Sequence, residues 1–225
     1  MSTARPASRI ESRIETVLFD LDDTLTDAAQ FGSSTLVHAA AAHGHRLDLD
    51  VVKQHPGAPY IPLLQRLLGL EQGEATEVYA TYVRRYGETM QHELQEHAGA
   101  SDLLQALVLR DTRLGLVTNK LERLALQIIG LYGWDRHFGV VVGQDSCAYR
   151  KPHPGIALHA LEALQGRPET TAFVGDTPGD MQCARAAGLG TVIGLASTTP
   201  TEVLTEAGAT VVCTDLGEVR RLLEG

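Results

Sequence analysis

Residues 16–27 read Thr-Val-Leu-Phe-Asp-Leu-Asp-Asp-Thr-Leu-Thr-Asp, so a short apolar run passes directly into four carboxylates within eight positions. The apolar run predicts a buried β-strand that ends near Leu21. Like charges crowded at a strand end are costly unless a cation neutralises them. Asp20 and Asp22 lie two apart, the period of a strand, so both could point to one side while Asp23 points elsewhere. The stretch predicts a magnesium-dependent site in which one aspartate attacks and another handles protons.

The size and charge of the chain narrow the class of protein. Its 225 residues suffice for one large domain, or for a domain with a smaller insert. An apolar content of 44% and a charged content of 21% are ordinary for a soluble globular protein. The net charge of -9 argues against a nucleic-acid partner, which requires basic surfaces. A small phosphorylated substrate remains compatible, because a bound cation can reverse the local field.

The cysteines and the N-terminal segment indicate the compartment. Cys147, Cys183 and Cys213 are odd in number and lack zinc-ribbon spacing, so we expect reduced cysteines and a cytoplasmic protein. Residues 1–15 are polar and are expected to form a frayed tail. No run approaches the roughly 20 apolar residues of a spanning helix, so no membrane partner is expected. The sequence leaves open whether the protein is a monomer or a homodimer.

Short runs rich in Val and Ile alternate with helical patterns, which predicts an α/β domain with a mainly parallel sheet. The runs do not alternate between apolar and polar residues, which is typical of strands buried on both faces. Ser101 is expected to cap the helix that carries Leu103–Leu109. After the first strand, the predicted strands are Leu114–Val117, Val140–Val142, Ala172–Val174, Thr191–Ile193 and Val211–Cys213.

The segment 28–96 departs from this alternation. It contains no convincing strand, and Leu36–Ala42, Leu63–Leu70 and Val78–Leu94 are predicted helices. A crossover between parallel strands needs only about a dozen residues, far fewer than this segment has. We therefore predict a helical cap at 28–96, inserted into a core formed by 16–27 and 97–225. The alternative is that these helices simply pad the main core.

Four polar clusters are expected at the carboxyl ends of predicted strands, where open α/β sheets bind their ligands. A hydroxyl and an amide at a helix N-terminus suit a phosphate group, and a lysine supplies positive charge. Two acids spaced four apart, beside a glycine that leaves room for close approach, complete the set. In chain order the clusters are Asp20 with Asp22, Thr118 with Asn119, Lys151 within Arg150–Pro154, and the run Gly175–Asp180.

Each cluster alone has a plainer interpretation. Thr118-Asn119 could be a helix cap, Lys151 a solvated loop lysine, and Gly175–Asp180 a turn with a cap. Their joint occurrence, each after a strand, favours a catalytic site.

The sequence lacks the motifs of several other classes of site. It has no Gly-x-x-x-x-Gly-Lys-Ser/Thr phosphate-binding loop and no Gly-x-Ser-x-Gly motif of serine esterases, and its histidines lack the spacing of a two-His metal helix.

The order of the four clusters resembles that of the haloacid dehalogenase-like (HAD) superfamily of phosphohydrolases. The pattern of that family is Asp-x-Asp-x-Thr, then Ser/Thr, then Lys, then Gly-Asp-x-x-x-Asp, and the likeness runs from Thr16 to Leu223. Val117–Lys120 and Arg150–Pro154 look most like the phosphoglycolate-phosphatase-like branch, which carries a helical cap after its first motif. The resemblance implies a Rossmann-like core, Mg²⁺ as cofactor, and a small phosphorylated metabolite as substrate.

The resemblance also implies a role for each matching residue. Asp20 would be the nucleophile that forms a phosphoaspartyl intermediate, and Asp22 would protonate the leaving alcohol and then activate water. Splitting the reaction into two displacements lets one acid/base residue serve both halves. Lys151 is expected to act in catalysis and, with Thr118 and Asn119, to bind the phosphoryl oxygens.

For the metal, the resemblance implies the Asp20 carboxylate, the backbone carbonyl of Asp22, and Asp176, with Asp180 as a direct or outer ligand. A carboxylate attacks a phosphate dianion poorly unless cations screen the repulsion, which agrees with this assignment. Many members have Gly where this chain has Asp23. Side-chain parity points Asp23 away from Asp20, so we expect catalysis to be retained.

Different functions remain open. An intramolecular phosphotransferase, such as a sugar phosphomutase, would use the same four clusters. A signalling receiver also traps phosphate on an aspartate, but its acceptor follows a middle strand and its domain is about half as long. A catalytically dead binding protein is disfavoured because no catalytic position is lost, and a dehalogenase because halide departure does not need the proton that Asp22 would give.

Overall fold

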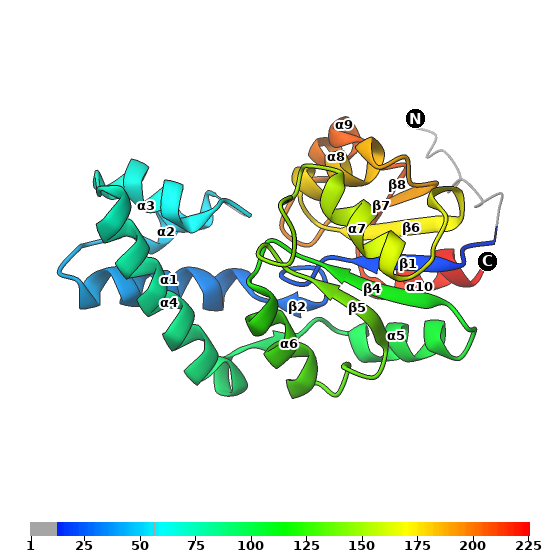
Figure 1. Ribbon diagram of the computed structural model, residues 1–225, viewed down its shortest axis with the longest axis horizontal. Coiled ribbons are helices and arrows are strands. Elements are labelled where there is room, and N and C mark those ends of the chain that lie inside the picture. Colours follow the sequence, from blue (N-terminus) through cyan, green and yellow to red (C-terminus); the bar gives the residue numbers. More distant parts are fainter. Residues whose placement is uncertain (1–12, 56) are drawn as a thin grey trace, which may run out of the picture.

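The computed structural model describes residues 13–55 and 57–225, and a six-stranded parallel sheet forms its centre (Figure 1). The strand order is β5-β4-β1-β6-β7-β8. All six strands were predicted, although the first ends at Phe19 and not at Leu21. The strands are β1 (Thr16–Phe19), β4 (Arg113–Val117), β5 (Phe138–Val142), β6 (Thr171–Gly175), β7 (Thr191–Leu195) and β8 (Val211–Cys213).

Helices cover both faces of the sheet, which is why the strands are mostly apolar. On one face, α5 (Ala100–Val108), α6 (Glu122–Leu131) and α10 (Leu216–Glu224) bury Val17 and Phe19. On the other face, α7 (Gly155–Ala163), α8 (Pro178–Ala186) and α9 (Thr201–Ala207) bury Leu18. Neighbouring residues of β1 thus point into different apolar clusters. A short 3₁₀ helix, η1 (Pro168–Thr170), leads into β6.

Four helices separate β1 from the rest of the sheet: α1 (Ala29–Ala42), α2 (Leu49–Lys53), α3 (Tyr60–Leu68) and α4 (Gln72–Glu93). Figure 1 shows them as a group beside the sheet, drawn in blue to cyan and blue-green. The group begins after β2 (Thr26–Asp27) and ends before β3 (Gln95–Glu96), and these two short strands pair antiparallel. The pairing holds both ends of the insert together. The α/β fold with a helical insertion after the first strand is therefore confirmed.

Several smaller predictions met different outcomes. Ser101 does not cap α5: Gly99, with a φ of 87°, precedes the helix, and the Ser101 hydroxyl donates to Glu96 and accepts from the indole of Trp134. The three cysteines are free, as expected. Most of the predicted N-terminal tail, residues 1–12, lies outside the described residues, and Glu15 is tied to the core through Thr170 and Arg167. Over residues 13–55 and 57–225, no helix is long and apolar enough to cross a membrane.

Candidate active site

Three strand ends meet at one edge of the sheet. β1 pairs with β4 on one side and with β6 on the other. The chain adds β4 and β5 on one side of β1 and then β6, β7 and β8 on the other, so the strand order reverses at β1. The residues that follow β1, β4 and β6 are Asp20, Thr118 and Asp176. The amide of Asp20 still donates to the carbonyl of Val174, at 2.9 Å, which fixes its backbone to the end of β6. Open α/β sheets bind ligands at such a reversal point.

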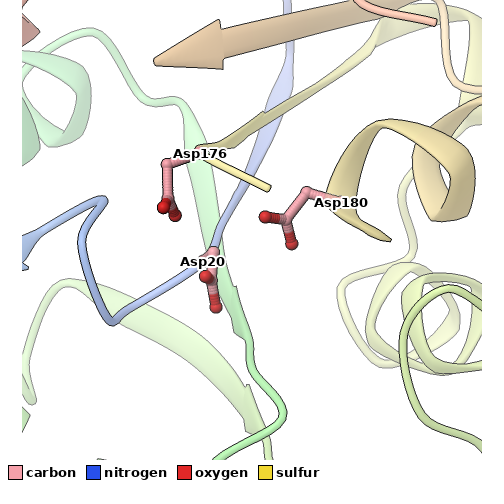
Figure 2. Close-up of side chains that lie close together, drawn as sticks. All are labelled: Asp20, Asp176 and Asp180. Atoms are coloured by element: carbon pink, nitrogen blue, oxygen red, sulfur yellow. The ribbon is translucent and has the colours of Figure 1, made fainter. Parts of the chain in front are cut away.

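Three aspartates converge at this edge. Asp20, Asp176 and Asp180 each offer a carboxylate oxygen, and these atoms all lie within 4.8 Å of one another. Figure 2 shows their carboxylates gathered from the end of β1, the end of β6 and the first turn of α8. The three residues are only 5%, 1% and 0% exposed. Two of the acids come from the fourth predicted cluster and one from the first, so the structure brings these clusters together.

Lys151 joins two of these carboxylates. Its ammonium lies 2.6 Å from Oδ1 of Asp20 and 2.6 Å from Oδ1 of Asp180, and its side chain is 5% exposed. Asn119 holds the Lys151 backbone: its Nδ2 donates to the Lys151 carbonyl at 3.1 Å, and its Oδ1 accepts from the Lys151 amide at 2.9 Å. Asn119 therefore sets the position of the lysine, while its neighbour Thr118, 2% exposed, lies at the same sheet edge.

Asp180 is fixed by the start of α8. Its Oδ2 accepts from the amide of Thr177 at 2.9 Å and from the Thr177 hydroxyl at 2.6 Å, while the Thr177 hydroxyl accepts from the Asp180 amide at 3.3 Å. This reciprocal capping box satisfies helix-terminal donors and leaves Oδ1 for Lys151. A Cβ on Gly175 would lie 2.5 Å from Cγ of Asp180, so only glycine permits this approach.

Asp176 is held by two hydroxyls. Thr24 donates to its Oδ1 at 2.9 Å, and Thr198 donates to its Oδ2 at 2.8 Å. Thr24 belongs to the loop after β1, and Thr198 follows β7. Both hydroxyls orient the carboxylate without neutralising it. Thr198 could not be identified from the sequence, because a threonine in a loop after a strand carries no distinguishing pattern.

Asp22 lies outside the group of three aspartates. Because β1 ends at Phe19, strand alternation does not place Asp22, and the Leu21 carbonyl instead accepts from the amides of Leu25 and Thr26 in a turn. Oδ2 of Asp22 lies 2.9 Å from the ammonium of Lys120, and its Oδ1 is buried without a hydrogen-bond partner among the described residues. Lys120 could not be assigned a role from the sequence, because its position after Thr118-Asn119 was the only feature that set it apart.

Asp23 points elsewhere, as predicted. Its Oδ1 accepts from the amides of Ala28 and Ala29, at 3.0 and 2.7 Å, so it satisfies donors at the start of α1. Its φ of 60° lies in the left-handed region, which aspartate tolerates better than most residues. Asp23 is a structural residue of the turn that leads from the site into the helical insert.

Burial and like charge dominate the electrostatics of the site. The pKa of Asp20 is raised to about 7: burial is the main cause, the Lys151 ammonium opposes the shift, and the neighbouring Asp180 adds to it. Burial, together with Asp180 and Asp20, also raises the pKa of Asp176 well above its usual range. For Lys151, burial favours the neutral amine, but the carboxylates of Asp180 and Asp20 prevail and raise its pKa. One ammonium therefore faces three buried carboxylates.

This charge imbalance fits a divalent cation. Asp20, Asp176 and Asp180 supply oxygen donors, the ligand type that Mg²⁺ prefers. Within the described part of the chain, Lys151 is the one cation that contacts these carboxylates, and the other contacts come from hydroxyls and the Thr177 amide. A bound Mg²⁺ would offset the cost of ionising three adjacent buried acids. The residues present thus suit the metal that the motifs imply.

Comparisons with known proteins show which family the chain is similar to. A family model described as haloacid dehalogenase-like hydrolase matches residues 17–193. A phosphoglycolate phosphatase of Xylella fastidiosa is 34% identical over 183 residues, covering 80% of each chain. A solved structure described as a predicted phosphatase of Clostridium acetobutylicum has a TM-score of 0.83 at 23% identity, and the match covers 95% of this chain and 100% of that one.

A β-phosphoglucomutase candidate of Thermotoga maritima is also similar, with a TM-score of 0.72 and 25% identity, covering 94% of this chain and 97% of that one. The family match spans most of the chain and includes the ends of β1, β4 and β6, where the site residues lie. The chain belongs to the haloacid dehalogenase-like hydrolases, the family that its ordered motifs resemble.

Proposed function

We propose that this hydrolase is a Mg²⁺-dependent phosphomonoesterase that acts on a small phosphorylated metabolite through a phosphoaspartyl intermediate. The observation that carries the proposal is the contact of Asp20 with Lys151 beside the acidic pair Asp176 and Asp180. A carboxylate nucleophile, a cation site and an ammonium thus share one edge of the sheet. Phosphoryl transfer depends mainly on such positioning and charge neutralisation.

In the first half of the reaction, a carboxylate oxygen of Asp20 attacks the phosphorus and the bond from phosphorus to the alcohol oxygen breaks. Asp22 donates its proton to the departing alcohol. Lys151 and the Thr118 hydroxyl bind the phosphoryl oxygens, and Asn119 keeps Lys151 in place. In the second half, Asp22 takes a proton from water, which attacks the phosphorus and releases Asp20 and inorganic phosphate.

The metal would be held by the carboxylates of Asp20 and Asp176 and by the backbone carbonyl of Asp22, with Asp180 as a direct or outer ligand. When bound, Mg²⁺ screens the repulsion between the carboxylate nucleophile and the phosphate dianion. Asp180 also holds Lys151, at 2.6 Å, so it would serve the cation and the ammonium together.

The helices of segment 28–96 would form a cap over this site. A Cβ on Gly57, in the loop between α2 and α3, would lie 3.3 Å from Cγ2 of Thr177, which caps α8 beside Asp180. The insert therefore reaches the rim of the acidic group. We assign substrate selection to the insert, because the sheet edge itself supplies only phosphate and metal contacts.

A panel of phosphorylated metabolites, with phosphoglycolate among the first compounds, tests this proposal. Phosphate release that requires Mg²⁺ and stops on addition of EDTA is the expected result. No release from any member, including the activated ester p-nitrophenyl phosphate, would overturn the proposal.

A second candidate is an intramolecular phosphotransferase, favoured by the likeness to the Thermotoga maritima phosphoglucomutase candidate. Both reactions use the same Asp20 intermediate and differ in whether water or a substrate hydroxyl accepts the phosphoryl group. Product analysis separates them: a sugar phosphate isomer formed without free phosphate indicates the mutase.

A further inference from the structure

Lys120 is a second buried lysine beside the proposed catalytic residues, and no step above uses it. Its side chain is 6% exposed, and its ammonium lies 2.9 Å from Oδ2 of Asp22. The same ammonium lies 3.9 Å from the ring centroid of Tyr86, a residue of α4 in the helical insert. One charged group therefore contacts both the proposed acid/base residue and the cap.

We propose that Lys120 is a positioning residue that holds the Asp22 carboxylate for proton transfer only while Tyr86 of α4 is packed against it. This inference deepens the proposed function and rests on the role given there to Asp22. It makes α4 part of the machinery that aligns the acid, beyond its role as a cover.

The backbone of Lys120 is held by residues of the loops that follow β4 and β5. Its amide donates to the Thr118 hydroxyl at 3.2 Å, and its carbonyl accepts from the Gln144 amide at 2.8 Å. A Cβ on Gly143 would lie 2.8 Å from that carbonyl oxygen, so glycine allows the two loops to meet. The Lys120 side chain therefore extends from a backbone whose position is fixed.

Tyr86 presents its ring face to this ammonium. The residue is fully buried, and its ring packs against Phe31 and Tyr82, with centroids 4.5 and 5.6 Å away. Its hydroxyl is buried and has no hydrogen-bond partner within residues 13–55 and 57–225, so the contact with Lys120 is made by the π face. A cation over an aromatic face gains more when both are desolvated, as they are here.

The two oxygens of Asp22 are in different situations. Oδ2 contacts the Lys120 ammonium, while Oδ1 is buried and no described residue forms a hydrogen bond with it. An oxygen in that state suits proton exchange with an alcohol or a water at the scissile bond. Anchoring Oδ2 fixes the direction in which Oδ1 points, which is what a positioning residue contributes.

Comparing phosphate esters whose leaving groups differ in basicity tells whether Lys120 positions Asp22 or has a merely structural role. An alkyl phosphate needs a proton on its departing oxygen, whereas p-nitrophenolate departs readily without one. The Lys120→Met variant should therefore lose at least tenfold more kcat/KM on an alkyl phosphate than on p-nitrophenyl phosphate. The Lys120→Arg variant, which keeps the cation, should recover part of that loss. An equal loss on both esters would overturn the proposal.

Lys53→Met is the matched control, because Lys53 is exposed at the end of α2 in the same insert. It should leave the ratio of the two kcat/KM values unchanged. An inactive wild-type protein would overturn the proposed function, whereas an active wild type with an unselective Lys120→Met loss would overturn only the positioning role.

A double-mutant cycle tests the contact with α4. Tyr86→Leu should reproduce the selective loss on the alkyl phosphate, and Tyr86→Phe, which keeps the ring face, should lose much less. Urea unfolding midpoints provide a readout independent of activity: the shifts from Lys120→Met and Tyr86→Leu should be non-additive in the double variant. Additive shifts, or no selective loss in Tyr86→Leu, would contradict the coupling to the cap.

Discussion

At the scale of single residues, the proposed chemistry places the greatest demand on Asp20. Only a carboxylate oxygen can form the acyl phosphate, and Asn supplies an amide of the same size that attacks poorly. We expect Asp20→Asn to lower kcat by at least about a thousandfold with little loss of stability. Phosphate release and a thermal melt of the same preparation measure both.

The exposed Asp27 provides a matched control for that variant, since Asp27→Asn makes the same chemical change seven positions further along. It should retain full activity. Substantial turnover by Asp20→Asn would mean that another group is the nucleophile.

Asp176 offers a second test at this scale. Its two hydroxyl contacts, from Thr24 and Thr198, orient the carboxylate toward Asp20 and Asp180 without supplying positive charge. Asp176→Asn keeps the shape but removes a ligand charge, so the Mg²⁺ concentration for half-maximal activity should rise at least about tenfold. A metal titration at fixed substrate measures this. An unchanged titration would show that Asp176 does not bind the metal.

The sequence identified the acidic residues, but the structure was needed to show how they are held. Asp20, Asp176 and Asp180 were predictable because each follows a strand or starts a helix in a recognisable motif. Lys120 and Thr198 were not assigned roles, because their contacts join segments far apart in the chain. A lone lysine or threonine near a helix start can serve many structural roles, and only the folded chain selects one.

At the scale of elements, β6 and α8 meet in a tightly packed junction beside the site. Gly175→Ala would place a Cβ 2.5 Å from Cγ of Asp180, so the acid or the strand must move. We expect lower stability, by about 1–3 kcal/mol, together with a higher Mg²⁺ concentration for half-maximal activity. Urea unfolding and a metal titration measure the two effects.

Gly179, in the first turn of α8, supplies the control for Gly175→Ala. A Cβ there would meet nothing closer than Oγ1 of Thr177, at 3.6 Å, and Ala favours a helical position. Gly179→Ala should therefore keep both stability and activity. If Gly175→Ala behaves like Gly179→Ala, the close approach of β6 to Asp180 does not matter for function.

The strands buried on both faces were predictable because their short apolar runs are bounded by turn residues and alternate along the chain with longer helical patterns. The short elements were not predicted: β2 and β3 have two residues each, and α2 has five. They carry too few residues for a periodic pattern to emerge. The start of α1 at Ala29, well before the predicted Leu36, depends on Asp23, whose side chain satisfies donors from a turn upstream.

At the scale of the whole molecule, the acidic site links stability to pH and to metal. The pKa of Asp20 is raised from 3.8 to about 7 in the folded protein, chiefly by burial. Between about pH 4 and 7 the metal-free folded state therefore holds a proton that the unfolded chain has released. The free energy of unfolding of the metal-free protein should fall as pH rises through this window. Asp176, shifted in the same direction, adds to the effect.

Magnesium should offset this loss of stability at higher pH, because it binds the ionised carboxylates and competes with their protons. At about 100 times its dissociation constant, Mg²⁺ adds about 2.7 kcal/mol, which corresponds to roughly 5–10 °C in Tm for a chain of this size. The increase in Tm should be larger at pH 8 than at pH 5.5, where protons occupy the site. Thermal melts at both pH values, with Mg²⁺ and with EDTA, measure it. In Asp20→Asn the decline of metal-free stability with pH should flatten, since the residue whose burial causes much of it no longer ionises. If Mg²⁺ raised the Tm of the wild-type protein equally at both pH values, these acids would not be metal ligands.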